Sequence, residues 1–171
     1  AGKYLLEVNG RWDGSSKFTG DKQYGFFPSF SAGWVLSQEK FWQPLKQAVQ
    51  DLKLRGSYGV TGNQSVDLYS YFASLTSAGY DFGGQSVAGY RQTTLANEDL
   101  GWESTTQLDI GLDLTAFSRK LNFTIDYYRK VTNDILLNLS IPATVGLTAP
   151  FQNAGSVENK GWEFSANYNG S

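Results

Sequence analysis

The sequence predicts an all-β fold, an antiparallel up-and-down sheet, from three observations. Apolar and polar residues alternate in six segments of the chain, and a side-chain period of two is the period of a β-strand. Aromatic residues make up 15% of the chain, which also holds 19 glycines. Third, no apolar run approaches the length of about 20 residues that a transmembrane helix needs. Such sequences form β-sandwiches or β-barrels.

Three of the six predicted strands precede residue 61. A polar loop is expected over 14–24, after the first strand. Between the second and third strands, the stretch 37–50 carries Phe41, Leu45 and Val49 at helical spacing, which predicts a short helix despite Pro44. The apolar faces of these strands are Tyr4, Leu6, Val8 and Trp12 in 4–12, then Phe30, Ala32, Trp34 and Leu36 in 28–36, then Leu52, Leu54, Tyr58 and Val60 in 52–60.

The fourth and fifth predicted strands form a hairpin within Thr105–Lys130. If the four-residue turn Phe117–Lys120 closes this hairpin, apolar residues face each other on one side and polar residues on the other. The predicted apolar pairs are Leu114 with Phe123, Leu112 with Ile125, and Ile110 with Tyr127, and the polar side pairs Asp113 with Thr124 and Gly111 with Asp126. A sixth strand over 161–169 repeats the alternation with Trp162, Phe164, Ala166 and Tyr168.

The connections between the predicted strands are unequal in length. Asn63–Gly101 is interpreted as an irregular connection of 39 residues, and so long a stretch is either functional or a sign of a wrong assignment. Pro142–Gly155 is a second loop, whereas Phe117–Lys120 is a tight turn. The longest loops fall at one end of the strands, as in barrels that have short turns on the opposite side.

The apolar face could meet a protein core, as in a soluble sandwich, or lipid, as in a transmembrane barrel. The predicted strands run about 10 to 14 residues, longer than the usual mode of about 5 to 6 and near the 9–11 that cross a bilayer at a tilt. Aromatic pairs Tyr4 and Trp12, and Phe26 and Trp34, are eight residues apart. Eight residues climb roughly 19 Å at a 45° tilt, which approaches an apolar band ~25 Å tall. These features favour lipid, and therefore a transmembrane barrel segment.

The composition excludes several kinds of chemistry. Met, Cys and His are absent, which leaves no thiolate nucleophile, no His acid–base catalyst and few ligands for transition metals. The net charge of −2, with mixed signs, is unlike that of a nucleic-acid-binding domain. Asp109 and Asp113 are about 13 Å apart along one strand, outside the ~5–9.5 Å of glycosidase pairs. We expect no enzymatic activity, no cofactor, no metal and no nucleic-acid partner.

Six sequence blocks carry a family resemblance. They are "GRWDGSSKF", "YGFFPSFSAGWVLSQEKF", "LKLRGSYGVTGN", "NEDLGWESTTQLDIGLDL", "IDYYRKVTNDILL" and "QNAGSVENKGWEF". In this order they resemble the barrel of SusC/RagA-type TonB-dependent outer-membrane transporters. The resemblance covers nearly all of the chain from Tyr4 to Tyr168, and the chain departs from the family pattern between Ser65 and Ala96.

The resemblance implies a 22-stranded barrel in the outer membrane of a Gram-negative bacterium, with its lumen plugged by an N-terminal domain. A SusD-like surface lipoprotein would cap the barrel, and TonB with its inner-membrane motor would pull on the plug to import bulky glycans or peptides. Because six strands cannot close such a barrel, residues 1–171 are expected to be one partial barrel domain that lacks the plug and the other strands. The helix within 37–50 would be periplasmic. The alternative is a soluble or secreted β-sheet carbohydrate-binding module.

Two groups of residues are candidates for functional roles. The first comprises the charges expected to face the barrel lumen, with at least one contact between a cation and a carboxylate: Lys53, Arg55, Asp109, Asp113, Asp126 and Glu163. The second comprises six aromatic residues of the long connection, accompanied by one basic residue, Arg91. They could touch the lid or the substrate, or they could pack the loop on itself: Tyr69, Tyr71, Phe72, Tyr80, Phe82 and Tyr90.

Overall fold

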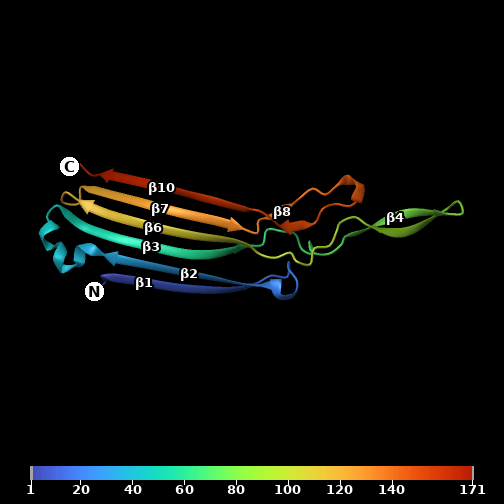
Figure 1. The fold of residues 1–171 in the computed structure, drawn as a ribbon, viewed down its shortest axis with the longest axis horizontal. Coiled ribbons are helices and arrows are strands. Elements are labelled where there is room, and N and C mark those ends of the chain that lie inside the picture. The colour runs from blue at the N-terminus through green and yellow to red at the C-terminus, as the bar shows by residue number, and fades with distance from the viewer. Residues whose placement is uncertain (1, 171) are drawn as a thin grey trace.

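Six long strands form one open antiparallel sheet in the computed structural model, which describes residues 2–170 (Figure 1). Neighbours in the chain are neighbours in the sheet once the short loop strands are set aside, so the predicted up-and-down topology is confirmed. Within the described residues, no helix is long and apolar enough to cross a membrane. The six strands are β1 (Tyr4–Gly14), β2 (Tyr24–Val35), β3 (Val49–Asn63), β6 (Glu103–Ala116), β7 (Leu121–Asn133) and β10 (Ser156–Tyr168).

The register of the β6–β7 hairpin is the one that the sequence predicts. Leu114 lies opposite Phe123, Leu112 opposite Ile125 and Gly111 opposite Asp126. The turn that closes the hairpin is tight, with the Lys120 N–H donating to the Phe117 carbonyl at 3.1 Å. Three successive non-glycine residues of this turn, from Phe117 to Arg119, have φ between 53° and 65°. That left-handed backbone costs roughly 1–2 kcal/mol per residue, and the flanking strands hold it.

Short helical structure is present within 37–50, as predicted, but it forms two 3-10 helices instead of one helix and ends before residue 50. Two 3-10 helices stand there, η2 (Leu36–Gln38) and η3 (Lys40–Leu45), and Val49 already begins β3. Pro44 lies inside η3, where it has no N–H to donate and keeps a longer α-helix from forming. Of the three residues at helical spacing, Phe41 and Leu45 therefore belong to η3, whereas Val49 begins the strand.

The connection Asn63–Gly101, expected to be irregular, contains regular structure, which corrects that expectation. It carries a hairpin of its own, β4 (Leu75–Phe82) and β5 (Gln85–Gln92), which projects beyond the end of the sheet (Figure 1). Gly83 and Gly84 form its two-residue turn, with φ of 60° and 79°, as the hairpin turn that needs positive φ at both positions requires. The other loops hold shorter elements: η1 (Gly20–Gln23), β8 (Leu136–Asn138), η4 (Ala143–Val145) and β9 (Phe151–Asn153).

The main sheet is a single layer, and its apolar face is open along its height. Leu6 is 80% exposed, Trp162 63% and Phe164 66%. The buried hydrophobic cluster lies among the loops instead, and consists of Phe18, Val66 and Leu100 with partly buried Tyr71, Trp102, Leu136 and Phe151 packed against it. We call these seven residues the loop-end cluster. The sheet therefore has no protein core on either face within residues 2–170.

At the opposite end, Glu39 ties the edge strand β1 to the connection between β2 and β3. Its carboxylate accepts hydrogen bonds from Lys3 Nζ at 3.1 Å, Tyr4 Oη at 2.8 Å and Trp34 Nε1 at 3.3 Å. These bonds, with the one from the Tyr4 hydroxyl contributing most, lower the pKa of Glu39 below its ordinary range. The carboxylate therefore stays ionised at neutral pH and keeps all three donors, with the rings of Tyr4 and Trp34 stacked beside it.

Candidate functional site

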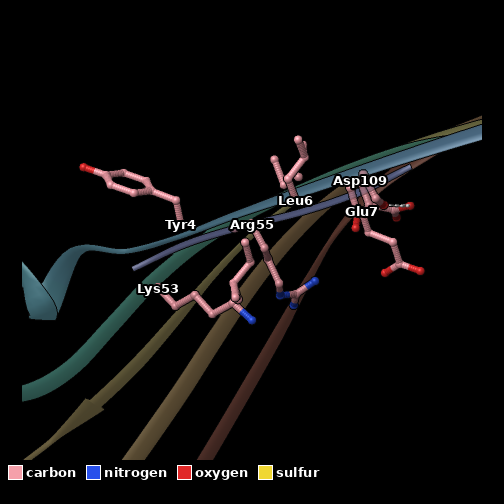
Figure 2. A pocket seen from close by; sticks show the side chains of 12 residues that line it. Tyr4, Leu6, Glu7, Lys53, Arg55 and Asp109 are labelled. Carbon is pink, nitrogen blue, oxygen red and sulfur yellow. Dashed lines mark hydrogen bonds between the residues drawn. The ribbon is translucent and has the colours of Figure 1, made fainter. Parts of the chain in front are cut away.

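The polar face of the sheet holds a hollow of about 650 Å³ across β1, β2, β3 and β6. Lys53, Arg55, Glu7 and Asp109 line it, and Figure 2 shows Lys53 and Arg55 extending to one side of the sheet while Tyr4 extends to the other. The alternation of the strands explains this arrangement, because neighbouring residues of a strand point to opposite faces. At this hollow, the basic side chains Lys53 and Arg55 therefore lie on the side of the sheet opposite to the Tyr4 ring.

Arg55 is the centre of a charge cluster that crosses three strands. Its Nε lies 3.1 Å from Asp113 Oδ2 on β6, and its Nη2 lies 2.6 Å from Asp126 Oδ1 on β7. The cation–carboxylate contact expected from the register is therefore present. The three side chains are 22–40% exposed, and ion pairs this open contribute about 0–1 kcal/mol each. The cluster therefore pairs opposite charges on a solvent-exposed face and contributes little to the stability of the fold.

Gly111 makes the Arg55 cluster possible. It lies between Arg55 and Asp126 in the sheet, since it is directly opposite both residues on the neighbouring strands. A Cβ at Gly111 would lie 2.5 Å from Arg55 Cζ, closer than side-chain carbons approach. The glycine therefore leaves the gap through which the guanidinium of β3 reaches past β6 to a carboxylate of β7.

The other charged residues predicted for this face lie on it without joining the cluster. Lys53 is directly opposite Asp113, and Glu163 is directly opposite Asp126, but neither Lys53 nor Glu163 makes an ion pair within residues 2–170. Asp109 accepts a hydrogen bond from Gln107 Nε2 at 3.0 Å. Within the same range, no group of three or more His, Cys, Asp or Glu side chains could hold a metal ion.

The loop-end cluster joins three connections that are far apart in the chain. Around it, amide side chains bind loop backbone: Asn97 Nδ2 donates to the Phe151 carbonyl at 2.7 Å, and Asn153 accepts from the Gly101 N–H at 2.8 Å and donates to the Gly101 carbonyl at 2.9 Å. On the β3 side, Lys17 Nζ donates to the Gln64 carbonyl at 3.2 Å. The base of the β4–β5 hairpin is therefore anchored.

The structure does not bring the six predicted loop aromatics into one site. Tyr71 packs on the loop-end cluster, so for this residue the loop does pack on itself. Tyr69 and Phe72 pack with each other, their ring centroids 6.3 Å apart, and both are exposed. The remaining three stand on the hairpin, where Tyr80 lies over Gly89 and Phe82 and Tyr90 are 69% and 75% exposed.

Several residues that shape these surfaces were not singled out from the sequence. Phe18 and Leu100, the fully buried side chains of the loop-end cluster, stand in segments without periodicity. Asn97 and Asn153 form their bonds with connections about 54 positions away. The one local signal was the Gly83–Gly84 pair between two alternating segments, which is a hairpin signature.

The chain belongs to the family described as TonB dependent receptor-like, beta-barrel, whose model matches residues 1–169. This is the class of protein that the open, one-sided apolar sheet defines, and the predicted resemblance is confirmed.

Particular relatives sharpen the family assignment. The chain is 44% identical to TonB-dependent receptor P26 of Formosa agariphila, over 96% of this chain and 17% of the relative. It is 37% identical to TonB-dependent receptor SusC of Bacteroides thetaiotaomicron, again over 96% and 17%. Among solved structures it resembles the RagAB peptide importer in its closed-closed state, with a TM-score of 0.84, 29% identity, and coverage of 96% of this chain and 18% of the other. These relatives are named as receptors and importers, not as enzymes, and the chain spans under a fifth of their length.

Proposed function

We propose that this chain forms part of the barrel wall of an outer-membrane TonB-dependent transporter of the SusC/RagA type, which imports bulky nutrients such as glycans or peptides. The plug domain and the remaining strands of the proposed 22-stranded barrel would come from sequence beyond this chain. TonB, driven by the inner-membrane motor, would act through that plug. Alone, the six strands would not transport anything.

The observation that carries the proposal is the exposed apolar face of a single-layered sheet. Leu6, Ile110 and Phe164 belong to three different strands of that face and are 48–80% exposed. Burying an aliphatic or aromatic side chain is worth about 1.5–3 kcal/mol, so a face of this extent needs an apolar covering. A bilayer supplies it, whereas a soluble carbohydrate-binding module would need a second protein layer.

The orientation follows from the connections. Tight turns of bacterial barrels are periplasmic, so the Phe117–Lys120 turn and the two short helices η2 and η3 would face the periplasm. The β4–β5 hairpin and the loop-end cluster would then face the cell exterior, where a SusD-like lipoprotein lid and the substrate arrive. On the polar face, the charged side chains would line the lumen: Lys53, Arg55, Asp109, Asp113, Asp126 and Glu163.

Uptake by intact cells tests the proposal. Removing the complete transporter should abolish uptake of its labelled oligosaccharide or peptide, and restoring it should recover uptake. In detergent extracts the complete protein should co-purify with a surface lipoprotein. Two results together would favour the soluble carbohydrate-binding module. The purified protein would be monodisperse without detergent, and cells that lack it would take up the labelled compounds as before.

A further inference from the structure

The hollow of the polar face carries opposite charges at its two ends. Lys53 lies at the end nearer the tight turn, and Glu7 and Asp109 lie at the end nearer the loops. The two carboxylates belong to one row of the sheet, with Ser31 and Ser57 between them, because each of these four residues is directly opposite the next. Lys53 precedes Ser57 by four residues on β3, which separates it from that row by about 13 Å along the strand.

The side chain of Lys53 extends over β2 instead of towards the carboxylate beside it. Lys53 is directly opposite Asp113 on β6, yet a Cβ at Gly33 on β2 would lie 3.2 Å from Lys53 Cε. Gly33 thus leaves the space in which the lysine side chain lies. Lys53 is half-buried, and Figure 2 shows its charged end on the same side of the sheet as those of Arg55 and Glu7. An ammonium placed in this way is suited to an anionic group of a ligand.

The free charges of the hollow are the Lys53 ammonium and the two carboxylates at the other end. Arg55, which lies between the two ends, is already paired with Asp113 at 3.1 Å and with Asp126 at 2.6 Å. Glu7 and Asp109 each accept a hydrogen bond from a neutral amide side chain. In the part of the chain that the structure describes, neither of these two carboxylates forms an ion pair.

We propose that the hollow binds a short peptide with free termini. Its C-terminal carboxylate lies against Lys53, and its N-terminal ammonium lies at the acidic end formed by Glu7 and Asp109. An extended chain spans at most about 3.3–3.6 Å per residue, so about four residues reach from one end to the other. On the floor, the hydroxyls of Ser31 and Ser57 can donate to peptide carbonyls or accept from peptide N–H groups. The volume of about 650 Å³ is that of a small-ligand site.

The two signs of charge favour a peptide over a glycan at this site. A neutral oligosaccharide would leave the Lys53 ammonium and both carboxylates unpaired. A polyanionic oligosaccharide would meet Glu7 and Asp109 with like charge, which discriminates against it. A peptide with free termini supplies one charge of each sign at the required separation. This inference rests on the proposed transport function and names the substrate class within it.

Calorimetric titration of tetra-alanine into the purified complete transporter tests the inference. Amidating the C-terminus of tetra-alanine, or acetylating its N-terminus, should weaken binding to the wild type about tenfold or more, because each change removes a charge-assisted hydrogen bond. In Lys53→Gln, free and amidated tetra-alanine should bind alike. In the double variant Glu7→Gln with Asp109→Asn, free and acetylated tetra-alanine should bind alike.

Lys130→Gln provides the matched control. Lys130 is on the polar face of β7, opposite Gln107 and Asn159, and does not line the hollow. This variant should keep the full effect of amidation, and heat-modifiable gel mobility would show that every variant is folded.

Two results would overturn the inference. One is an effect of amidation that is as large in Lys53→Gln as in the wild type. The other is an absence of tetra-alanine binding to the complete transporter, as expected if the plug fills the hollow. If cells still import a labelled oligosaccharide through a transporter that does not bind tetra-alanine, the peptide site is refuted and the transport proposal stands. If the protein is absent from the outer membrane and its loss leaves uptake unchanged, both are refuted.

Discussion

Leu112→Arg should prevent assembly of the complete transporter, whereas Asp113→Asn should leave assembly intact. Leu112 lies on the apolar face, opposite Leu54 and Ile125 on the neighbouring strands, near the middle of the band. An arginine there costs about 2–4 kcal/mol near the bilayer midplane, a large fraction of the about 5–15 kcal/mol that stabilises a folded protein. The amount of folded barrel in outer-membrane fractions, measured by heat-modifiable gel mobility, checks this expectation.

Asp113→Asn is the matched control, since it alters the adjacent residue on the opposite face. It weakens the contact with Arg55, which at 40% exposure of the Asp113 side chain is worth about 0–1 kcal/mol. Asp126 remains as a second partner for Arg55. Equal yields of folded barrel from the two variants would remove the argument that the Leu112 face meets lipid.

Deleting residues 75–92 should leave insertion of the barrel intact and weaken lid binding or uptake. The deletion is feasible because the Thr93 N–H donates to the Ser74 carbonyl at 2.8 Å, so the two ends of the hairpin already meet. Loss of a few exposed aromatic contacts, each worth more than about 1 kcal/mol at an interface, should weaken lid association about tenfold or more, since about 1.4 kcal/mol is tenfold. Pull-down of the lipoprotein by the complete transporter, with uptake in cells, measures the effect.

A variant with serine in place of Tyr80, Phe82 and Tyr90 distinguishes the contribution of the aromatic rings to lid binding from that of the hairpin backbone. It keeps the β4–β5 pairing and removes the exposed rings, so it should reproduce most of the loss seen on deletion. Normal lid binding and undiminished uptake in both variants would show that the hairpin is passive. Tyr71 is left untouched in each, because it packs on the loop-end cluster.

The strands and their register could be predicted because alternation and a tight turn are local signals. The pairing of Leu112 with Ile125 follows from counting residues out from Phe117–Lys120. The contact of Arg55 with Asp113 follows from the third predicted strand beginning, and the fourth ending, at the same end of the sheet. The contact between Arg55 and Asp126, which spans two strand spacings, could not be predicted as readily. It depends on the space that Gly111 leaves between the two side chains. In the sequence, that glycine is simply a small residue on a polar face.

The loop region was harder to predict because its structure depends on distant contacts. Phe18 and Leu100 are buried together, although the strands β2 to β5 lie between them in the sequence. No periodicity marks either residue. The helical spacing of Phe41 and Leu45 was real but too short to form an α-helix around Pro44. The Glu39 network was not expected either, because its donors come from separate segments: Lys3 precedes β1, Tyr4 begins β1 and Trp34 lies in β2.

The most direct test of the account is lipid-phase quenching along one strand of the complete, reconstituted transporter. Single fluorophores would be attached in turn to cysteines at positions 108 to 114 of β6, in vesicles containing brominated lipid. The account predicts a period of two, with quenching at Leu108, Ile110, Leu112 and Leu114 and little at Asp109, Gly111 and Asp113. Equal quenching at both sets of positions, or none at either, would contradict the assignment of this sheet to a lipid-facing barrel wall.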